Sequence, residues 1–172
     1  MQLPVPFFSQ QAGDIPEEWH SRACGVAALS MALAYAGADA PVPALIDEGV
    51  AAGAYRAGRG WQHAGLAELA LRHGARAWRR EYKWNGLARP FAMPFALSAL
   101  RHALKRGIVP IVSLTTSTED THLVTLTGFG REGWRYNDPA KRSEREGKDL
   151  VMSTKEFARR FRKLAIFIAR AA

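Results

Sequence analysis

The stretch Cys24-Gly-Val-Ala-Ala-Leu-Ser-Met-Ala-Leu-Ala-Tyr-Ala36 decides how the rest of the chain is interpreted. Ala, Leu and Met are strong helix formers, and Gly37 directly after the run is a typical C-cap. Because the segment is apolar on almost every side, it predicts a helix buried at the centre of the molecule. Ser21 is a candidate N-cap. A cysteine therefore stands at the start of a buried helix.

Glycines and prolines divide the flanking sequence into further elements. Before residue 107 the pattern is mainly helical, and the expected helices are 42–52, 64–73 and 95–106, with a loop at 56–60. After residue 107 β-branched residues and alternation predict strands at 108–114, 121–127, 134–137 and 164–169. Ser153-Thr-Lys-Glu156 matches a capping box for a helix to about residue 162, and 142–149 reads as a polar loop. Helices followed by mostly antiparallel strands predict an α+β fold.

Length and composition limit the classes of protein that this chain can be. A chain of 172 residues is expected to form one domain, residues 1–172. Hydrophobic residues make up 48% and charged residues 23%, which is typical of a globular protein. The single cysteine excludes an internal disulfide and a four-cysteine zinc module.

The net charge of +8 favours weak attraction to polyanions without identifying a partner. Two basic clusters, 76–80 and 159–163, each contain an aromatic residue. We interpret both as solvated faces rather than as a specific nucleic-acid site. No apolar run approaches the ~20 residues that cross a bilayer, so no membrane span is expected. Residues 1–10 lack the features of a signal peptide, which predicts a cytoplasmic chain unless a leader has been removed.

Three polar positions stand out against their surroundings: Cys24 at the helix start, His122 at the beginning of an apolar strand, and Asp138 at the end of the next one. A helix N-terminus stabilises a thiolate through its partial positive charge and unpaired N–H groups. A neighbouring histidine can take the thiol proton, and a carboxylate on its other nitrogen fixes the tautomer. The N–H of Cys24 could help to hold an oxyanion, and Gly25 would leave room for a substrate backbone.

Each of the three residues also has a purely structural interpretation. Cys24 could be a small core residue, His122 could bond a backbone carbonyl, and Asp138 before Pro139 could form a turn. Their order along the chain favours the catalytic interpretation. A helix-start cysteine, a distant strand histidine and then an aspartate is the chain order of a papain-like site.

Several motifs follow one another in an order that points to a family. They are Val5-Pro-Phe-Phe-Ser-Gln10, Ala23-Cys-Gly-Val-Ala-Ala-Leu-Ser-Met31, Leu104-Lys-Arg-Gly-Ile-Val-Pro-Ile-Val-Ser113, Thr121-His-Leu-Val-Thr-Leu-Thr-Gly128, Tyr136-Asn-Asp-Pro139 and Ser153-Thr-Lys-Glu-Phe157. Over nearly its whole length the chain resembles the papain-like cysteine peptidases of the bacterial double-glycine (bacteriocin) leader-peptidase group and their broader stand-alone relatives.

The resemblance implies a papain-like fold, with an N-terminal helical part packed on a C-terminal antiparallel sheet. It implies Cys24 as nucleophile, His122 as general base and then acid, and Asp138 as the orienting residue. It also implies an oxyanion glutamine before the cysteine: Gln10 is the better candidate because it closes the Val5–Gln10 motif, and Gln11 is the runner-up. Two features depart from the leader peptidases: Ala23 replaces an Asp, and Gln10 lies 14 residues before Cys24.

Other candidate sites have weaker support. His20 lies four residues before Cys24, which would suit a metal on one helix face, but two further ligands cannot be identified. His63, His73 and His102 read as surface or helix-end residues. Trp61 and Trp84 are expected to pack in the core rather than to line a substrate groove. No phosphate-binding loop is present, and neither a metal nor another cofactor is expected.

The sequence therefore predicts a cysteine-dependent hydrolase that cleaves a peptide or related amide bond through an acyl-enzyme on Cys24. The expected partner is a peptide or protein substrate, and the oligomeric state stays open. Two alternatives remain: a non-catalytic domain of the same fold that binds a peptide or partner, and an acyltransferase that passes the same acyl group to an amine.

Overall fold

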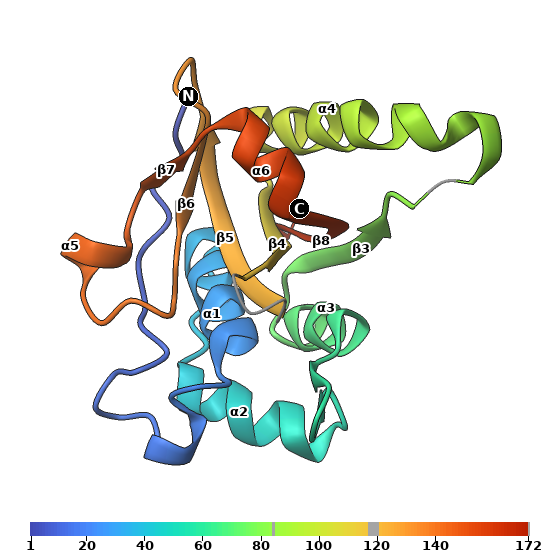
Figure 1. The fold of residues 1–172 in the computed structure, drawn as a ribbon. Helices are drawn as coiled ribbons and strands as arrows, with labels where there is room; N and C mark the ends of the chain where they lie inside the picture. The colour runs from blue at the N-terminus through green and yellow to red at the C-terminus, as the bar shows by residue number, and fades with distance from the viewer. Residues whose placement is uncertain (84, 117–120, 172) are drawn as a thin grey trace.

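The computed structural model describes residues 1–83, 85–116 and 121–171. At its centre lies a six-stranded sheet in the order β3-β8-β4-β5-β6-β7, in which every neighbouring pair is antiparallel (Figure 1). The strands are β3 Arg76–Glu81, β4 Val109–Thr115, β5 Thr121–Phe129, β6 Trp134–Asn137, β7 Leu150–Met152 and β8 Phe161–Ala169. The predicted α+β class is therefore confirmed.

One face of the sheet is covered by the helices of the first half of the chain: α1 Cys24–Ala36, α2 Val42–Ala51 and α3 His63–Arg72. Helix α1 packs on β5, β4 and β8, and α3 packs on β3 and β8 (Figure 1). The hydroxyl of Thr125 on β5 donates to the carbonyl of Ala28 at 3.1 Å. This bond helps to hold α1, and with it Cys24, in a defined position against the sheet.

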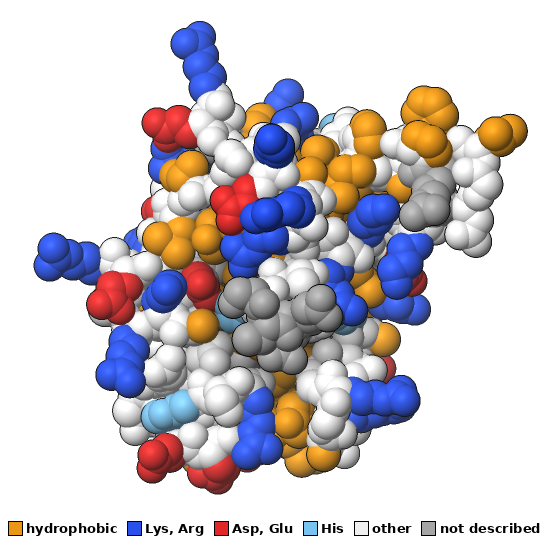
Figure 2. Space-filling model, in the orientation of Figure 1, with side chains coloured by type: hydrophobic (Ala, Val, Ile, Leu, Met, Phe, Trp, Pro, Cys, Tyr) orange, Lys and Arg blue, Asp and Glu red, His pale blue; other side chains and the backbone are white. Residues whose placement is uncertain are grey.

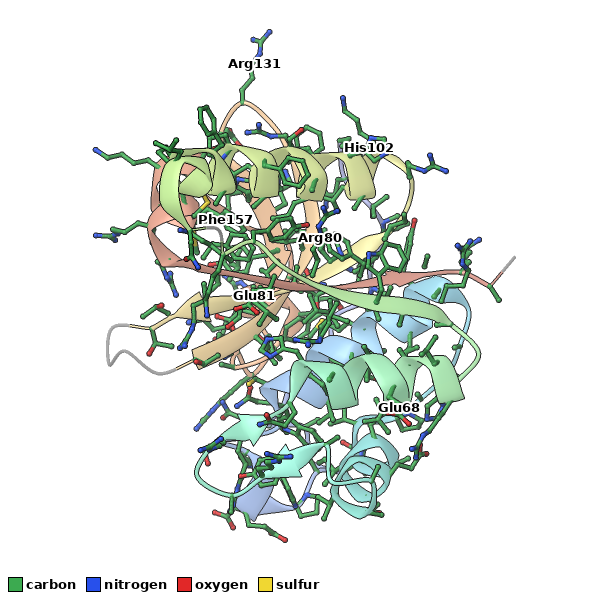
Figure 3. All side chains as sticks on the ribbon, turned by 90° about the vertical axis from the view of Figure 1, so that its right-hand side faces the viewer. Glu68, Arg80, Glu81, His102, Arg131 and Phe157 are labelled. Atoms are coloured by element: carbon green, nitrogen blue, oxygen red, sulfur yellow. The ribbon has the colours of Figure 1, made fainter. Side chains whose placement is uncertain are left out.

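The opposite face of the sheet is covered by α4 Ala92–Lys105, which follows the 3-10 helix Gly86–Phe91 and contacts β4, β5 and β8. Figure 3 shows α4 on one side of the sheet and α3 on the other. Helix α6 Thr154–Arg160 contacts β4, and its Phe157 stacks between Trp134 and Phe161. The sheet is thus buried on both faces.

The start of the chain pairs with the end of the interior strand β5. The N–H of Leu3 donates to the carbonyl of Thr127 at 2.7 Å, and Gln2 bridges to Gly128. The short 3-10 helix Glu17–Trp19 then leads into α1. Two further short elements are the hairpin of β1 Tyr55–Arg56 with β2 Gly60–Trp61, and α5 Glu144–Gly147 before β7.

Most expected elements are confirmed, some with shifted ends. Helix α1 has the predicted bounds, and Gly37 follows it at φ 88° as the predicted left-handed cap. Ser153 caps α6 by accepting from the N–H of Glu156 at 3.2 Å. That helix ends at Arg160 rather than at residue 162, because β8 begins at Phe161 and pairs with β4.

Other expectations were wrong. The predicted N-cap Ser21 does not cap α1: Ala23 occupies that position without a side-chain bond, because a turn at Trp19 delays the helix start. Helix α4 begins at Ala92 rather than 95, and the expected polar loop 142–149 contains α5. By contrast, the expected loop 56–60 contains the turn of a small hairpin. The basic cluster 76–80 forms a largely exposed face, as expected, although no strand was predicted there and it lies in β3.

Within the part of the chain that the structure describes, no helix is both long and apolar enough to cross a membrane.

Candidate active site

Cys24 is the first residue of α1 and is partly buried. The backbone turns once before the helix, since the carbonyl of Trp19 accepts from the N–H groups of Arg22 and Ala23, each at 2.9 Å. No side chain caps the first turn of the helix. The thiol therefore stands at a helix N-terminus, where partial positive charge stabilises an anion.

His122 is held between Asp138 and Cys24. Its Nε2 bonds Oδ1 of Asp138 at 2.6 Å, with both side chains largely buried. The side chain of Cys24 is close enough for its hydrogen bonding and its charge to raise the pKa of His122. Because Nε2 is engaged by the carboxylate, Nδ1 is the nitrogen left for the sulfur. The sequence-predicted Cys, His and Asp thus lie in one hydrogen-bonded row.

The electrostatics of this row favour charged side chains. Burial lowers the pKa of His122, but its hydrogen bonds to Asp138 and Cys24 and the charges of both residues raise it more, to about 9. Burial raises the pKa of Asp138. The hydrogen bond to His122, the charge of His122 and the hydrogen bond from the N–H of Ala140 outweigh this effect and hold the pKa below its usual value. Asp138 is therefore ionised and His122 protonated at neutral pH.

The turn that carries Asp138 is fixed by the residue before it. Asn137 is fully buried, accepts from the N–H of Asp149 at 2.9 Å and donates to the carbonyl of Pro6 at 3.0 Å. The N–H of Asp138 donates to Gly147 at 2.8 Å, and its Oδ1 also accepts from the N–H of Ala140 at 3.0 Å. Asn137 belongs to the Tyr136–Pro139 motif, and the sequence alone assigns it no role. In the structure its side-chain amide joins the turn to the N-terminal segment.

The same turn positions both candidate glutamines. The backbone N–H of Gln10 donates to the carbonyl of Pro139 at 2.8 Å. The side-chain Nε2 of Gln10 donates to the backbone carbonyl of His20 at 2.6 Å. The Gln11 side chain is bonded differently, since it donates to Ala140 at 2.8 Å and accepts from Arg142 at 3.1 Å. Gln10 thus lies beside the turn that leads to Cys24, whereas the Gln11 side chain is bonded to the loop after Pro139 through both its nitrogen and its oxygen.

Trp61 supports the cysteine from the other side. It is 6% exposed and donates Nε1–H to the carbonyl of Arg22 at 2.8 Å. A Cβ on Gly25 would come within 2.8 Å of its side chain. The expected core position of Trp61 is therefore confirmed. The expectation that Gly25 gives a substrate room was wrong, because this close packing against Trp61 is what requires glycine. Trp84 lies outside the described residues.

The remaining histidines have separate surroundings. His20 bonds the carbonyl of Ile15 through Nε2 at 2.9 Å, His73 pairs with Glu48, and His102 is exposed on α4 (Figure 3). Across the described ranges, no group of three or more His, Cys, Asp or Glu side chains is arranged to hold a metal.

His63 is a helix-end residue, as the sequence suggested, since it is the first residue of α3, but it is partly buried rather than exposed. Its Nε2 is buried without a hydrogen-bond partner among the described residues. Burial, together with the charges of Arg79 and Arg162, lowers its pKa to about 4. Nothing in the sequence around residue 63 distinguishes it from an ordinary helix-end histidine.

Comparisons with known proteins point to one family of peptidases. The sequence model of the Peptidase_C39 like family matches residues 2–165. A search of the curated proteins found no match. Among solved structures, a putative C39-like peptidase from Bacillus anthracis is similar, with a TM-score of 0.68 and 19% identity over 98% of this chain and 96% of that one.

Two further neighbours are peptidase domains. A double glycine motif protease from an AMS/PCAT transporter, solved with the leader peptide, has a TM-score of 0.63 and 21% identity over 98% of this chain and 94% of that one. The peptidase domain of Streptococcus ComA has a TM-score of 0.60 and 19% identity over 87% and 93%. These likenesses show a papain-like fold, and with the family match they support a peptidase function. Since the family model spans nearly the whole sequence, the chain belongs to the C39-like peptidase family.

Proposed function

We propose that this protein is a cysteine peptidase in which Cys24 is the nucleophile, His122 the general base and acid, and Asp138 the residue that orients His122. The observation that carries the proposal is the position of the His122 ring, which bonds Asp138 at 2.6 Å and lies close enough to Cys24 for that side chain to raise its pKa. The family match over residues 2–165 supports a peptidase with a single domain, 1–172.

The reaction follows from this row of side chains. The Cys24 thiolate attacks the carbonyl carbon of the scissile amide, and the carbonyl π electrons move to oxygen. Protonated His122 then gives its Nδ1 proton to the leaving nitrogen as the C–N bond breaks, which leaves a thioester on Cys24. Water attacks the thioester while His122 takes its proton, and the acid product leaves as the thiol is restored. Asp138 stabilises the imidazolium whenever it forms.

Gln10 is the proposed oxyanion donor together with the backbone N–H of Cys24. A side-chain amide has two N–H donors, and the His20 carbonyl uses one of those on Gln10. The second is available to a substrate oxygen. Gln11 is the weaker candidate, because its amide is bonded to Ala140 and Arg142.

A peptide is the proposed substrate class. One structural neighbour is described as bound to a leader peptide, which supports an extended peptide for this chain too. The alternatives are a non-catalytic peptide-binding domain and an acyltransferase.

The test is mass spectrometry of a peptide library incubated with the purified protein, with and without an added primary amine. Hydrolysis gives two products whose masses add up to the mass of the peptide plus one water. Because the proposed reaction requires Cys24, Cys24→Ala should abolish it. Products joined to the amine in place of water would favour transfer. Absence of any product with the wild type, with peptides still bound, would overturn catalysis in favour of binding.

A further inference from the structure

A basic cavity lies beside the candidate active site. Its volume is about 260 Å³, and it opens between the β1–β2 hairpin, the start of α3 and the ends of β4, β5 and β8. Its charged lining side chains are Arg59, Lys83 and Arg162, and no carboxylate lines it among the described residues. It therefore presents positive charge to a bound molecule.

Two of the residues that line the cavity are neighbours of His122 and of the start of α1. Thr121, in its lining, directly precedes His122 on β5. Trp61, also in its lining, packs on Gly25 next to Cys24. A peptide whose scissile bond lies at Cys24 would therefore place a neighbouring residue at this cavity.

The polar groups of the cavity leave capacity for an anion. Arg162 bonds the hydroxyl of Thr121, and Lys83 pairs with Glu81 at 2.9 Å. Within residues 1–83, 85–116 and 121–171, no carboxylate pairs with Arg59 or Arg162. His63 lines the same cavity with an unpartnered Nε2, and it is the first residue of α3, where the helix dipole is positive.

We propose that this cavity binds a carboxylate of the substrate and gives the enzyme a preference for an acidic residue close to the bond that it cleaves. The proposal rests on the proposed peptidase function and names its substrate class. Trp61 and Leu164 supply apolar wall for the methylene groups of an Asp or Glu side chain, and the cations supply the charge.

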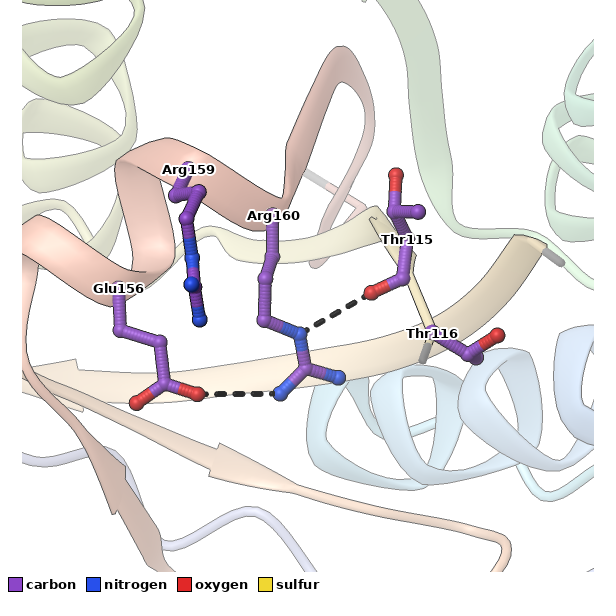
Figure 4. A pocket seen from close by; sticks show the side chains of 5 residues that line it. All are labelled: Thr115, Thr116, Glu156, Arg159 and Arg160. Atoms are coloured by element: carbon purple, nitrogen blue, oxygen red, sulfur yellow. Dashed lines mark hydrogen bonds and ion pairs between the residues drawn. The ribbon is translucent and has the colours of Figure 1, made fainter. Parts of the chain in front are cut away.

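A second basic cavity gives a useful comparison. It lies between β4 and α6, with a volume of about 530 Å³ (Figure 4). There Arg160 is already engaged, by the carbonyl of Thr115 at 3.0 Å and by Glu156 at 3.4 Å. Arg159 in its lining is exposed. Replacing Arg159 removes a charge from the molecule without changing the cavity next to His122.

The experiment uses internally quenched peptides in matched pairs that carry Glu or Gln at each position around the cleaved bond. A second set ends in a free carboxylate or an amide, which separates a side-chain carboxylate from a terminal one. In at least one pair, the wild type should cleave the acidic peptide with a kcat/KM about tenfold higher than that of its neutral partner. This preference should shrink as the salt concentration rises. The double variant R59Q/R162Q should reduce this preference below about twofold.

Two substitutions elsewhere, made separately and together, serve as controls that remove one or two positive charges. Arg131→Gln, at the tip of the β5–β6 turn (Figure 3), and Arg159→Gln should keep the preference. Hydrolysis without acid preference, a preference that survives in R59Q/R162Q, or one lost equally in the controls would each overturn the proposal.

Binding separates failure of this inference from failure of the proposed function. The same peptides, labelled with a fluorophore, are titrated into Cys24→Ala and followed by polarisation. If the wild type cleaves nothing, tighter binding of acidic peptides that disappears in R59Q/R162Q still supports the cavity. Equal binding of Glu and Gln peptides would overturn it whether or not the protein is a peptidase.

Discussion

At the scale of single residues, the reactivity of Cys24 is the most direct consequence of the site. Cys24 is the only cysteine, so whole-protein mass reports its alkylation without ambiguity. With His122 protonated beside it at a pKa of about 9, the sulfur should react with iodoacetamide rapidly even at pH 6. A free thiol, with a pKa of about 8.5, is almost entirely protonated there.

Variants of the two partners give the matched controls for that experiment. His122→Ala should move the alkylation profile toward high pH, because the imidazolium partner is removed. Asp138→Asn should have a smaller effect, because it disturbs orientation without removing the ring. A wild-type cysteine that reacts slowly at every pH, and quickly only after unfolding, would contradict the paired thiolate.

The two adjacent glutamines allow a second prediction at this scale. Gln10→Ala should lower kcat by about 10²–10³ while changing KM little, as expected for an oxyanion donor. Gln11→Ala should stay within a few-fold of the wild type, because its amide bonds the loop at Ala140 and Arg142. Steady-state kinetics on the best library peptide measure both. The reverse order of effects would assign the role to Gln11.

At the scale of elements, the turn after β6 joins the active site to the start of the chain. Asn137→Ala should lower the free energy of unfolding by about 2–3 kcal/mol, because it leaves buried backbone groups of Asp149 and Pro6 without partners. It should also lower kcat, since the turn positions Asp138 and Gln10. Urea unfolding and kinetics check the two effects.

Thr127→Val is the matched control for Asn137. Thr127 is also buried and bonds Asp149, through Oδ1 at 2.9 Å, but it has no side-chain bond to the N-terminal segment. Loss of the Thr127 hydroxyl should lower the free energy of unfolding by about 1 kcal/mol and leave kcat near the wild-type value. Equal kinetic effects of the two variants would argue against a positioning role for Asn137.

The elements also show what the sequence can predict. Helix α1 was found with correct ends because its composition and Gly37 are local signals. Strand β3 was missed because it is an edge strand whose exposed arginines are typical of edges that avoid aggregation. Helix α5 and strand β7 are too short for periodicity to reveal.

The candidate site also contains residues that local sequence signals predict and residues that depend on contacts across the fold. Cys24, His122 and Asp138 could be named because each stands at the end of a recognisable element within a family pattern. The sequence favours Gln10 over Gln11 only through the Val5–Gln10 motif, since the contacts of the two side chains depend on how residues 9–11 align with residues 139–141 across the fold. The cavity at His63 was missed for a related reason: its cations come from segments far apart in the chain.

At the scale of the whole molecule, the charges of the site are a small part of a basic surface. The face in Figure 2 carries more Lys and Arg than Asp and Glu, spread over many elements. Salt screens exposed charges of this kind with a Debye length of about 8 Å at physiological ionic strength. The largely buried pair of His122 and Asp138 is screened much less, so its contribution to folding should be visible in the stability of the entire chain.

The last prediction concerns how that contribution depends on pH. The pKa of His122 is raised to about 9 in the folded protein. The contribution of His122 to the free energy of unfolding is therefore fully present below the ordinary histidine pKa of about 6.5 and is lost as pH rises through 9. The pKa of Asp138 is lowered, so its share is present above about 4 and is lost as pH falls below that. The contribution of the pair to the free energy of unfolding is therefore complete between about pH 4 and 6.5 and declines on both sides of this range.

Asp138→Asn should accordingly cost most between pH 4 and 6.5, by about 3 kcal/mol for a buried pair that loses one partner. The difference from the wild type should shrink toward pH 3 and toward pH 10. Urea unfolding at each pH measures it. Glu68→Gln, which breaks the exposed pair with Arg72, should cost less than about 1 kcal/mol at every pH. A constant difference for Asp138→Asn across the range would mean that the aspartate acts as a turn former and not as the partner of a charged histidine.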